Sequence, residues 1–143
     1  MTFALPPVVV RRPARGRPGT IEAVPRLPNA DRRHWAARAR ATRAWRTTAF
    51  LVGASEGLAA LELGGGIVIR MVRVRSRGPE ADDDNATASF KPVRDGLADA
   101  IFGAGKGPTH DNDPRIRWEV AQERGARAGV RVDIIFGPTK EEP

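Results

Sequence analysis

The stretch IVIRMVRVR, residues 67–75, is the clearest structural signal in the chain. Its β-branched residues favour a strand, because they pack well on a pleated surface. Successive side chains of a strand point to opposite faces, so the stretch divides into two rows. One row holds Val68, Val72 and Val74, and the other runs from Ile67, Ile69 and Met71 into Arg73, Arg75 and Arg77. We therefore expect a strand whose second row becomes basic toward its end.

Upstream of this strand, the sequence predicts another strand and a long helix. Residues 21–27 form a short apolar run that Pro28 ends. Asn29 or Asp31 suits the cap of a helix that extends to about Val52, because their side chains accept hydrogen bonds from the first free amides.

Downstream, residues 85–102 carry an apolar stripe at helical spacing. Pro92 lacks an amide hydrogen, so either the helix kinks there or its regular part starts near Ser89. Residues 115–121 and 130–136 predict two strands joined as a hairpin. The order of elements predicts a small single domain of the α/β (α+β) class, with one mixed sheet of about four strands and two main helices.

The two ends of the chain differ in composition from the middle. Residues 1–20 are rich in Pro, Arg and Gly, which predicts a disordered basic N-terminal arm. Residues 21–136 hold the expected folded domain, and residues 137–143 form a polar C-terminal tail.

Charge points to a polyanionic partner. The chain has 143 residues, with 24 Lys and Arg against 17 Asp and Glu, a net charge of +7. Such a balance is typical of nucleic-acid-binding proteins, although 21 Arg against 3 Lys also fits a GC-rich genome. Cys is absent, which excludes disulfides and Cys-based metal sites. No apolar stretch is long enough for a membrane span or typical of a signal peptide, so we expect a cytoplasmic protein without a membrane partner.

Carboxylates crowd into one part of this basic chain. Asp82-Asp83-Asp84-Asn85 is followed by Asp95 and then by Asp111-Asn112-Asp113. Like charges held close together repel unless a cation lies between them. Oxygen ligands favour a hard cation such as Mg²⁺ or Mn²⁺. Acidic turns are also common on protein surfaces, and a simple solvated turn is the alternative.

Lys91 lies between the two acidic stretches. It stands four residues before Asp95, one turn away on a helix. The spacing suits a salt bridge worth a few tenths of a kcal/mol, which is the purely structural interpretation of this lysine.

Taken together, these motifs resemble the RusA-type Holliday junction resolvases, which are common in bacterial prophages. The resemblance spans about residues 21–136 and rests on the order of five motifs. They are Asp82-Asp83-Asp84-Asn85, Lys91, Asp95-Gly96-Leu97, the loop Gly103–Gly107 and Asp111-Asn112-Asp113.

The resemblance implies a RusA-like fold and a catalytic set. Asp82 and Asp84 match the two aspartates of the first motif, and Asp113 matches the third; these three would bind the metal. Lys91, about one helical turn further along than the family's lysine, completes the catalytic residues. The implied enzyme is a Mg²⁺-dependent endodeoxyribonuclease, acting as a homodimer that resolves four-way DNA by paired symmetric nicks in recombination and repair.

Basic side chains along the chain are candidates for contacts with DNA phosphates. They are Arg32, Arg33, Arg70, Arg73, Arg75, Arg77 and Lys106. Two other functions fit the same residues: a different structure-specific metal-dependent nuclease, acting on flaps or forks, or a non-catalytic DNA-binding phage protein. Neither involves a small-molecule substrate.

Overall fold

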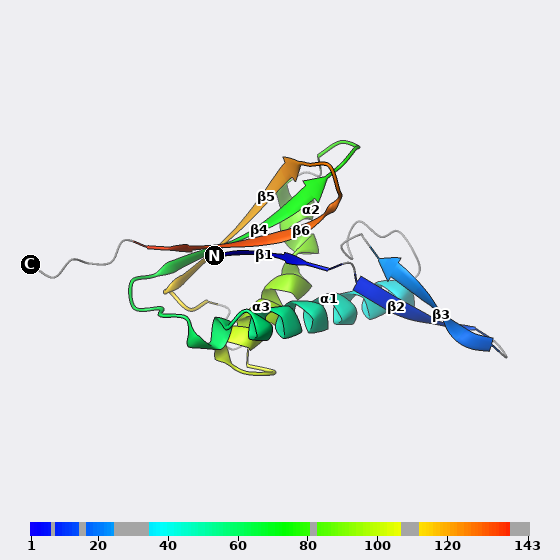
Figure 1. Cartoon of the computed structure of the whole chain (residues 1–143), viewed down its shortest axis with the longest axis horizontal. Coiled ribbons are helices and arrows are strands. Elements are labelled where there is room, and N and C mark those ends of the chain that lie inside the picture. The colour runs from blue at the N-terminus through cyan, green and yellow to red at the C-terminus, as the bar shows by residue number, and fades with distance from the viewer. Residues whose placement is uncertain (7, 15–16, 25–34, 81–82, 107–111, 138–143) are drawn as a thin grey trace, which may run out of the picture.

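The computed structural model describes residues 1–6, 8–14, 17–24, 35–80, 83–106 and 112–137 (Figure 1). Four strands form a mixed sheet in the order β1-β6-β4-β5, and β2 and β3 form a separate antiparallel pair. The strands are β1 (Thr2–Leu5), β2 (Val8–Ala14), β3 (Arg17–Val24), β4 (Ile67–Arg75), β5 (Ile116–Arg124) and β6 (Gly129–Phe136). The helices are α1 (Trp35–Ser55), α2 (Asp83–Ser89) and α3 (Lys91–Phe102), with a short 3-10 helix, η2 (Leu58–Ala60). This architecture confirms the predicted small α+β domain with a mixed sheet.

Strand β4 occupies residues 67–75, as its alternation predicts, and lies inside the sheet. It pairs in parallel with β5 and antiparallel with β6. The predicted β5–β6 hairpin is therefore wrong, because β4 lies between these two strands. Their connection passes close to the end of β4: Gly125 N donates to Arg75 O over 2.9 Å. A Cβ on Gly125 would lie 2.6 Å from Val74 Cγ1, so this position has no room for a side chain.

The prediction of a disordered arm over residues 1–20 is wrong for its described part. Strand β1 pairs antiparallel with β6, Phe3 opposite Val132, and buries Phe3 and Leu5 to 7% and 4% exposure. Strands β2 and β3 follow as a two-stranded ribbon, and the strand predicted over residues 21–27 overlaps the second half of β3. Composition alone misleads here, because the pairing partner of β1 lies at the far end of the chain.

The long downstream helix is divided in two. Phe90 separates α2 from α3, and Pro92 lies in the first turn of α3, where its missing amide hydrogen costs nothing. This is the second of the two arrangements expected for Pro92. Further along α3, a Cβ on Gly96 would lie 2.3 Å from Arg46 O of α1. Gly96 therefore sets the close approach of α1 and α3.

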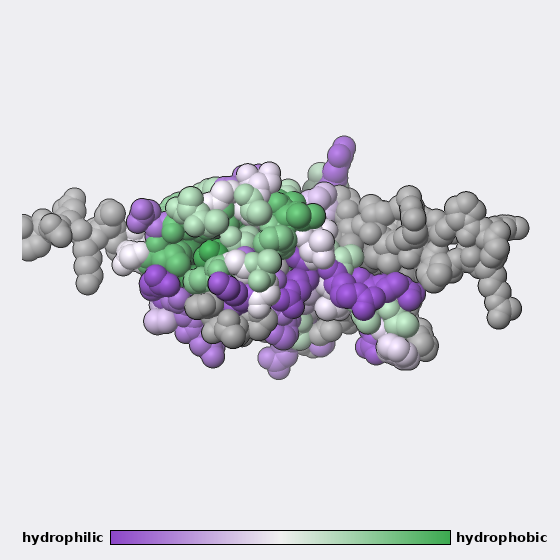
Figure 2. Space-filling view, turned by 90° about the horizontal axis from the view of Figure 1, so that it is seen from below, coloured by the Kyte–Doolittle hydropathy of each residue, from purple (hydrophilic) through white to green (hydrophobic). Residues whose placement is uncertain are grey.

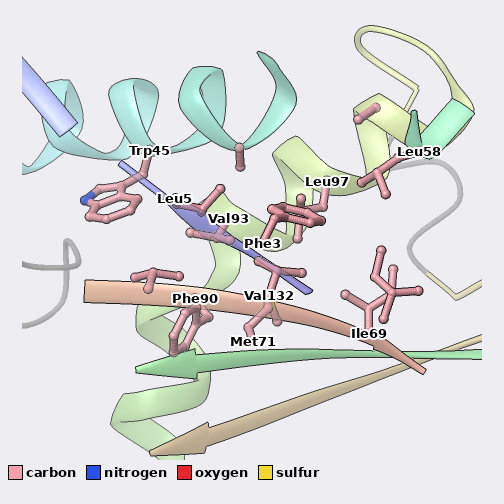
Figure 3. Packing of buried hydrophobic residues seen from close by; sticks show 14 of the residues in the cluster. Phe3, Leu5, Trp45, Leu58, Ile69, Met71, Phe90, Val93, Leu97 and Val132 are labelled. Carbon is pink, nitrogen blue, oxygen red and sulfur yellow. The ribbon is translucent and has the colours of Figure 1, made fainter. Parts of the chain in front are cut away.

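The core lies between the sheet and the two longer helices (Figure 3). Alternate residues of β1, β4 and β6 meet side chains from α1 and α3 there, and the largest of these are fully buried. Arg46 of α1 also reaches Asp99 of α3, with Nη2 2.9 Å from Oδ2, although Asp99 is only 6% exposed. The central members of the core are Trp45, Leu58, Ile69, Met71, Phe90, Val93, Leu97 and Val132.

Candidate functional site

A hollow of about 310 Å³ opens where α2 and the start of α3 cross β4 and β5. Its floor is apolar and its rim carries two cationic side chains. The lining residues are Met71, Thr87, Ala88, Phe90, Lys91, Arg94, Trp118 and Val120. A second, more polar hollow of about 270 Å³ adjoins it and shares Thr87 and Val120. Glu80 and Gln122 lie in its wall, so the two hollows form one seam between α2 and β5, called the α2–β5 seam below.

Asp84 stands beside this seam. It is exposed, and it precedes Thr87 and Ala88 by three and four residues on α2. Residues at these spacings share one side of a helix, so Asp84 lies one turn from the hollow. Asp82 and Asp111 lie outside the described residues.

Lys91 is the first residue of α3, and it borders the hollow. Its Nζ lies 3.4 Å from Oδ2 of Asp95, which confirms the predicted contact across one helical turn. The lysine side chain is 68% exposed while that of Asp95 is 13% exposed. Lys91 therefore contacts Asp95 yet stays open to a ligand at the rim of the hollow, whereas Asp84 lies one helical turn away along α2.

Arg94 and Trp118 complete the rim and are not among the residues singled out from the sequence. The Arg94 guanidinium lies 5.2 Å from the centre of the Trp118 ring, a cation–π contact between α3 and β5. A signal for Arg94 exists, since it follows Lys91 by three residues on the same helical face. Trp118 gives no such signal, because its neighbour on α3 is distant in sequence.

Asp113 lies away from Asp84. It precedes β5, whose first residue pairs with the first residue of β4. Helix α2, in contrast, adjoins the later part of β5, since Thr87 shares a hollow with Val120 and Gln122. A strand rises ~3.3 Å per residue, so Val120 and Gln122 lie about 13–20 Å along β5 from Ile116, at the end of the strand away from Asp113.

The carboxylate of Asp113 is held by its own loop. Its Oδ1 accepts hydrogen bonds from N and Nε of Arg115, both over 3.0 Å, and its Oδ2 from Nη2 over 2.8 Å. These bonds raise the pKa of the Arg115 guanidinium, with the side-chain hydrogen bond to Asp113 as the largest cause.

The carboxylates described by the structure do not form a complete metal centre within one chain. Among residues 1–137 with the gaps given above, no three Asp, Glu or His side chains gather closely enough to bind a metal ion. Asp84 fits a hard cation by its chemistry and exposure, together with Asp82 by sequence position. Asp113 of the same chain does not fit that site, because it lies near the opposite end of β5.

The predicted phosphate-binding side chains fall into different places. Arg70 lies on the helix-free face of the sheet, with Nε 3.0 Å from Glu119 Oε2. Arg75 is 8% exposed and donates to Gly78 O over 2.7 Å, which holds the segment after β4 and leaves little of it for a ligand. Arg73, half-buried, pairs in register with Gln122 beside the α2–β5 seam. Arg77 and Lys106 are exposed, while Arg32 and Arg33 lie outside the described residues.

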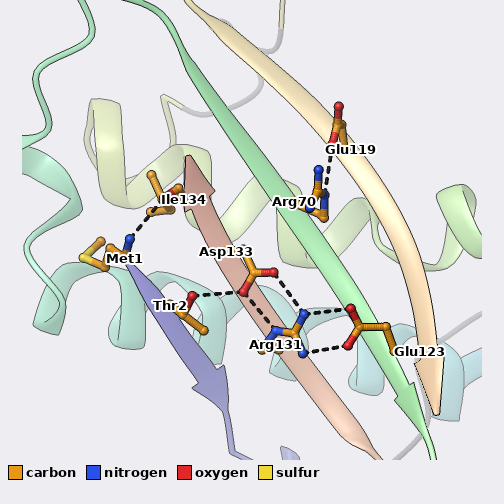
Figure 4. Close-up of polar contacts among 8 residues, drawn as sticks. All are labelled: Met1, Thr2, Arg70, Glu119, Glu123, Arg131, Asp133 and Ile134. Carbon is orange, nitrogen blue, oxygen red and sulfur yellow. Dashed lines mark hydrogen bonds and ion pairs between the residues drawn. The ribbon is translucent and has the colours of Figure 1, made fainter. Parts of the chain in front are cut away.

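The helix-free face of the sheet carries a balanced network of ion pairs (Figure 4). Arg131 joins Glu123 and Asp133, with Nη1 2.8 Å from Glu123 Oε2 and Nε 2.9 Å from Asp133 Oδ1. Thr2 also donates to Asp133 over 3.1 Å. Hydrogen bonds from Arg131 are the largest cause of the lowered pKa of both carboxyls.

Arg70 and Arg117 hold Glu119 in the same way, and hydrogen bonds from Arg117 and then Arg70 lower its pKa. Each arginine on this face therefore has a carboxylate partner. The view from the side of α1 and α3 differs: apolar residues gather over part of that surface, with polar residues around them (Figure 2). Exposed Trp35 and Leu51 of α1 belong to the apolar residues of the molecule's surface.

Comparisons with protein-family models, with curated proteins and with solved structures found no match to this chain. In the described part of the chain, no helix combines the length and the hydropathy needed to cross a membrane.

Proposed function

We propose that the protein is a metal-dependent endodeoxyribonuclease that resolves Holliday junctions by paired symmetric nicks in DNA recombination and repair. The observation that carries the proposal is a hollow rimmed by the cationic side chains of Lys91 and Arg94, with Asp84 one helical turn away along α2. An acidic side chain for a metal beside cationic side chains for a phosphate is the arrangement that phosphodiester hydrolysis needs. The order of the sequence motifs supports the choice of the RusA family and a cytoplasmic homodimer.

In this proposal Asp82 and Asp84 hold Mg²⁺, or Mn²⁺ in its place. When bound, the ion would polarise the scissile phosphate and make water more acidic. Lys91 donates to a phosphate oxygen and stabilises the charge that develops in the transition state. Its contact with Asp95 favours a position of the amine beside the hollow while the side chain stays exposed.

The phosphate backbone on either side of the cut would contact basic side chains near the α2–β5 seam. Arg73 is the strand residue placed for this role, and exposed Arg77 is a further contact beyond the end of β4. Lys106 is exposed past the far end of α3, away from the seam, and would reach only DNA that extends to that end of the protein. Arg70 and Arg75 serve the protein's own structure through Glu119 and Gly78. The proposal therefore keeps part of the basic set that the sequence suggests.

A cleavage assay on synthetic four-way DNA tests the function. We expect nicks at symmetric positions with Mg²⁺ and none with EDTA. Linear duplex, flap and fork substrates of the same sequence serve as controls. Equal cutting of flaps or forks would assign a different structure-specific nuclease, and binding of four-way DNA without cutting under any metal would assign a non-catalytic DNA-binding protein.

The variant Asp84→Asn tests the site itself. Removing the carboxylate should reduce cleavage by at least about a hundredfold, by analogy with the loss of other groups that stabilise a transition state. Junction binding should be retained or strengthened, because a negative charge near DNA is removed. Asp133→Asn, on the helix-free face, is the matched control and should cut at the parent rate. Undiminished cutting by Asp84→Asn would exclude the proposed metal site.

A further inference from the structure

The larger hollow of the α2–β5 seam has an apolar floor. Phe90 and Met71 are 0% and 2% exposed there, and half-buried Val120 lies beside them. The volume of about 310 Å³ is at the lower end of the range of ~300–1,000 Å³ that small-molecule sites occupy. Thr87 and Ala88 on its outer side are exposed, so the hollow is open to solvent. It therefore has room for one small planar group with apolar faces.

One wall of this hollow combines a planar cation with an aromatic ring. The Arg94 guanidinium lies 5.2 Å from the centre of the Trp118 ring, and both residues line the hollow. Unstacked nucleobases stack on aromatic side chains and on guanidinium planes in complexes with nucleic acids. Every base has a π face, so such stacking accepts any base. The wall therefore suits a nucleobase that has left its own stack.

The charge at the opening suits the phosphate of the same nucleotide. The Lys91 side chain lines the hollow and is 68% exposed. Lys91 precedes Arg94 by three residues on α3, a spacing that places both cations on one side of the helix. An apolar side chain of a partner protein would fill the floor and use neither cation. A nucleotide offers a base to the floor and a phosphate to the amine, so charge complementarity favours the nucleotide.

We propose that this hollow binds one nucleobase extruded from the DNA stack, with the adjoining phosphate on Lys91. The role rests on the proposed function and names the feature of DNA that the site recognises. Extrusion of a base costs free energy, and the cost is least for a base that is mismatched or already single-stranded. Stacking is interrupted at a branch point, so a base there leaves the stack more readily than one within an arm. Filling the hollow therefore favours branched over linear DNA.

Binding of deoxyadenosine monophosphate tests the hollow without reference to cutting. An NMR titration should show saturable shifts of the Trp118 indole signal and of the α3 amides, with weaker binding of deoxyadenosine or inorganic phosphate alone. Trp118→Ala should weaken binding about five- to a hundredfold, the range expected for one lost stacking partner. Trp118→Phe keeps a ring and should stay within about threefold of the parent. Trp35→Ala, at an exposed position on α1, is the control. No saturable binding, or equal losses in both alanine variants, would overturn the proposal.

A variant that fills the hollow from outside gives a test that leaves Trp118 in place, since this residue packs partly against the core. Ala88 is exposed on α2 and lines the hollow, so Ala88→Trp should occupy the space of the base. The matched control is Ala54→Trp, at an exposed alanine of α1. We expect Ala88→Trp to abolish binding of the monophosphate and Ala54→Trp to retain it. Undiminished binding by Ala88→Trp would contradict the assignment of the hollow.

Duplexes with and without a central mismatch test the preference for a base that leaves the stack readily. With EDTA present to prevent cutting, the parent and Ala54→Trp should bind the mismatched duplex at least about fivefold more tightly than the matched one. Ala88→Trp should bind the two duplexes equally. A parent without this preference, or a preference that survives in Ala88→Trp, would contradict base binding in the hollow.

An acidic peptide with one aromatic residue, Glu-Phe-Glu, is the competing probe for the same cations and floor. If the peptide binds in a Trp118-dependent manner and the monophosphate does not, the hollow is a protein-docking site and the proposal is wrong. A parent that binds the monophosphate with the expected variant pattern but cuts no DNA would refute the proposed function and leave the nucleotide site in place. Equal cutting of four-way DNA by Ala88→Trp and the parent would refute the role of the hollow and leave the nuclease in place.

Discussion

The two faces of the mixed sheet are built by different physics. On the face toward α1 and α3, Ile69 and Met71 of β4 are buried with 0% and 2% exposure. On the other face, Arg70 of the same strand is held by Glu119, and Arg131 joins Glu123 and Asp133. One face is held by apolar burial, while the other carries ion pairs whose side chains are partly exposed.

This difference means that the face toward α1 and α3 contributes most of the stability, and that the helix-free face is poorly suited to bind a polyanion. Burial of a large apolar side chain contributes about 1.5–3 kcal/mol, whereas an exposed ion pair contributes about 0–1 kcal/mol. The helix-free face also balances its arginines with carboxylates, so it offers little net charge to a polyanion. The exposed cationic side chain that borders the α2–β5 seam is that of Lys91, which is 68% exposed beside Asp95.

The largest effect should come from the core. Leu97→Ala removes a side chain with 0% exposure from the layer between α3 and the sheet. We expect a loss of about 2–5 kcal/mol in the free energy of unfolding, from the lost burial and the cavity that remains. Urea denaturation measures it. Leu51→Ala, at a residue with 59% exposure, should change the same quantity by less than about 0.5 kcal/mol. Similar losses for the two variants would contradict the packing described for α3.

A smaller loss is expected where α1 and α3 touch. Gly96→Ala would place a methyl group 2.3 Å from Arg46 O, which is too close without moving a helix. Overpacking should cost about 1–3 kcal/mol, even though Ala is the better helix former. Gly64→Ala is the control, because a Cβ there meets nothing within 4 Å. Stabilisation by Gly96→Ala in a denaturation curve would show that the helices are further apart.

Substitution of two arginines of β4, one on each face of the sheet, compares the two faces as DNA-binding surfaces. Arg73→Ala, beside the α2–β5 seam, should weaken binding to four-way DNA and reduce the slope of log K against log salt by about one unit. Arg70→Ala should leave the slope nearly unchanged, because Glu119 already neutralises that charge. Binding titrations over a range of salt concentrations measure both. The reverse result would move the phosphate contacts to the helix-free face.

The smallest effect should be a change in acid sensitivity. The pKa values of Glu123 and Asp133 are lowered from 4.5 and 3.8 chiefly by hydrogen bonds from Arg131. A depressed pKa contributes stability at pH values above the ordinary one, and this contribution is lost as pH falls through the folded-state value. The Tm of the parent should therefore drop below about pH 4.5, and Arg131→Gln should make that drop shallower. Arg127→Gln, also a lost surface charge, should keep the parent's profile.

Local signals in the sequence predict the elements well. The alternation over residues 67–75 defines β4 to the residue, and the position of Pro92 indicates where α3 begins. These features depend on a few neighbouring residues, which is the range over which propensity and periodicity act.

Pairing between segments that lie far apart in the chain could not be predicted from the sequence. The composition of residues 1–20 suggests disorder, yet Phe3 and Leu5 are ordered by a strand more than a hundred residues away. The Gly125 region suggests a hairpin, but β4 takes the place between β5 and β6. Asp84 and Asp113 come from two motifs that the resemblance assigns to one catalytic set, and the parallel register of β4 and β5 places them toward different ends of β5.

The pairing of β1 with β6 also has a consequence for the order of events during synthesis. Thr2 lies opposite Asp133, so β1 leaves the ribosome long before β6, and its pairing is completed only after β6 has been made. Until then Phe3 and Leu5 have no sheet to pack against, and their apolar side chains stay exposed on the nascent chain. Contacts of such sequence separation are slow to form, because loop closure must precede them. The sheet should therefore gain its native edge late, after β6 has been made, and a chaperone would protect the open edge until that step.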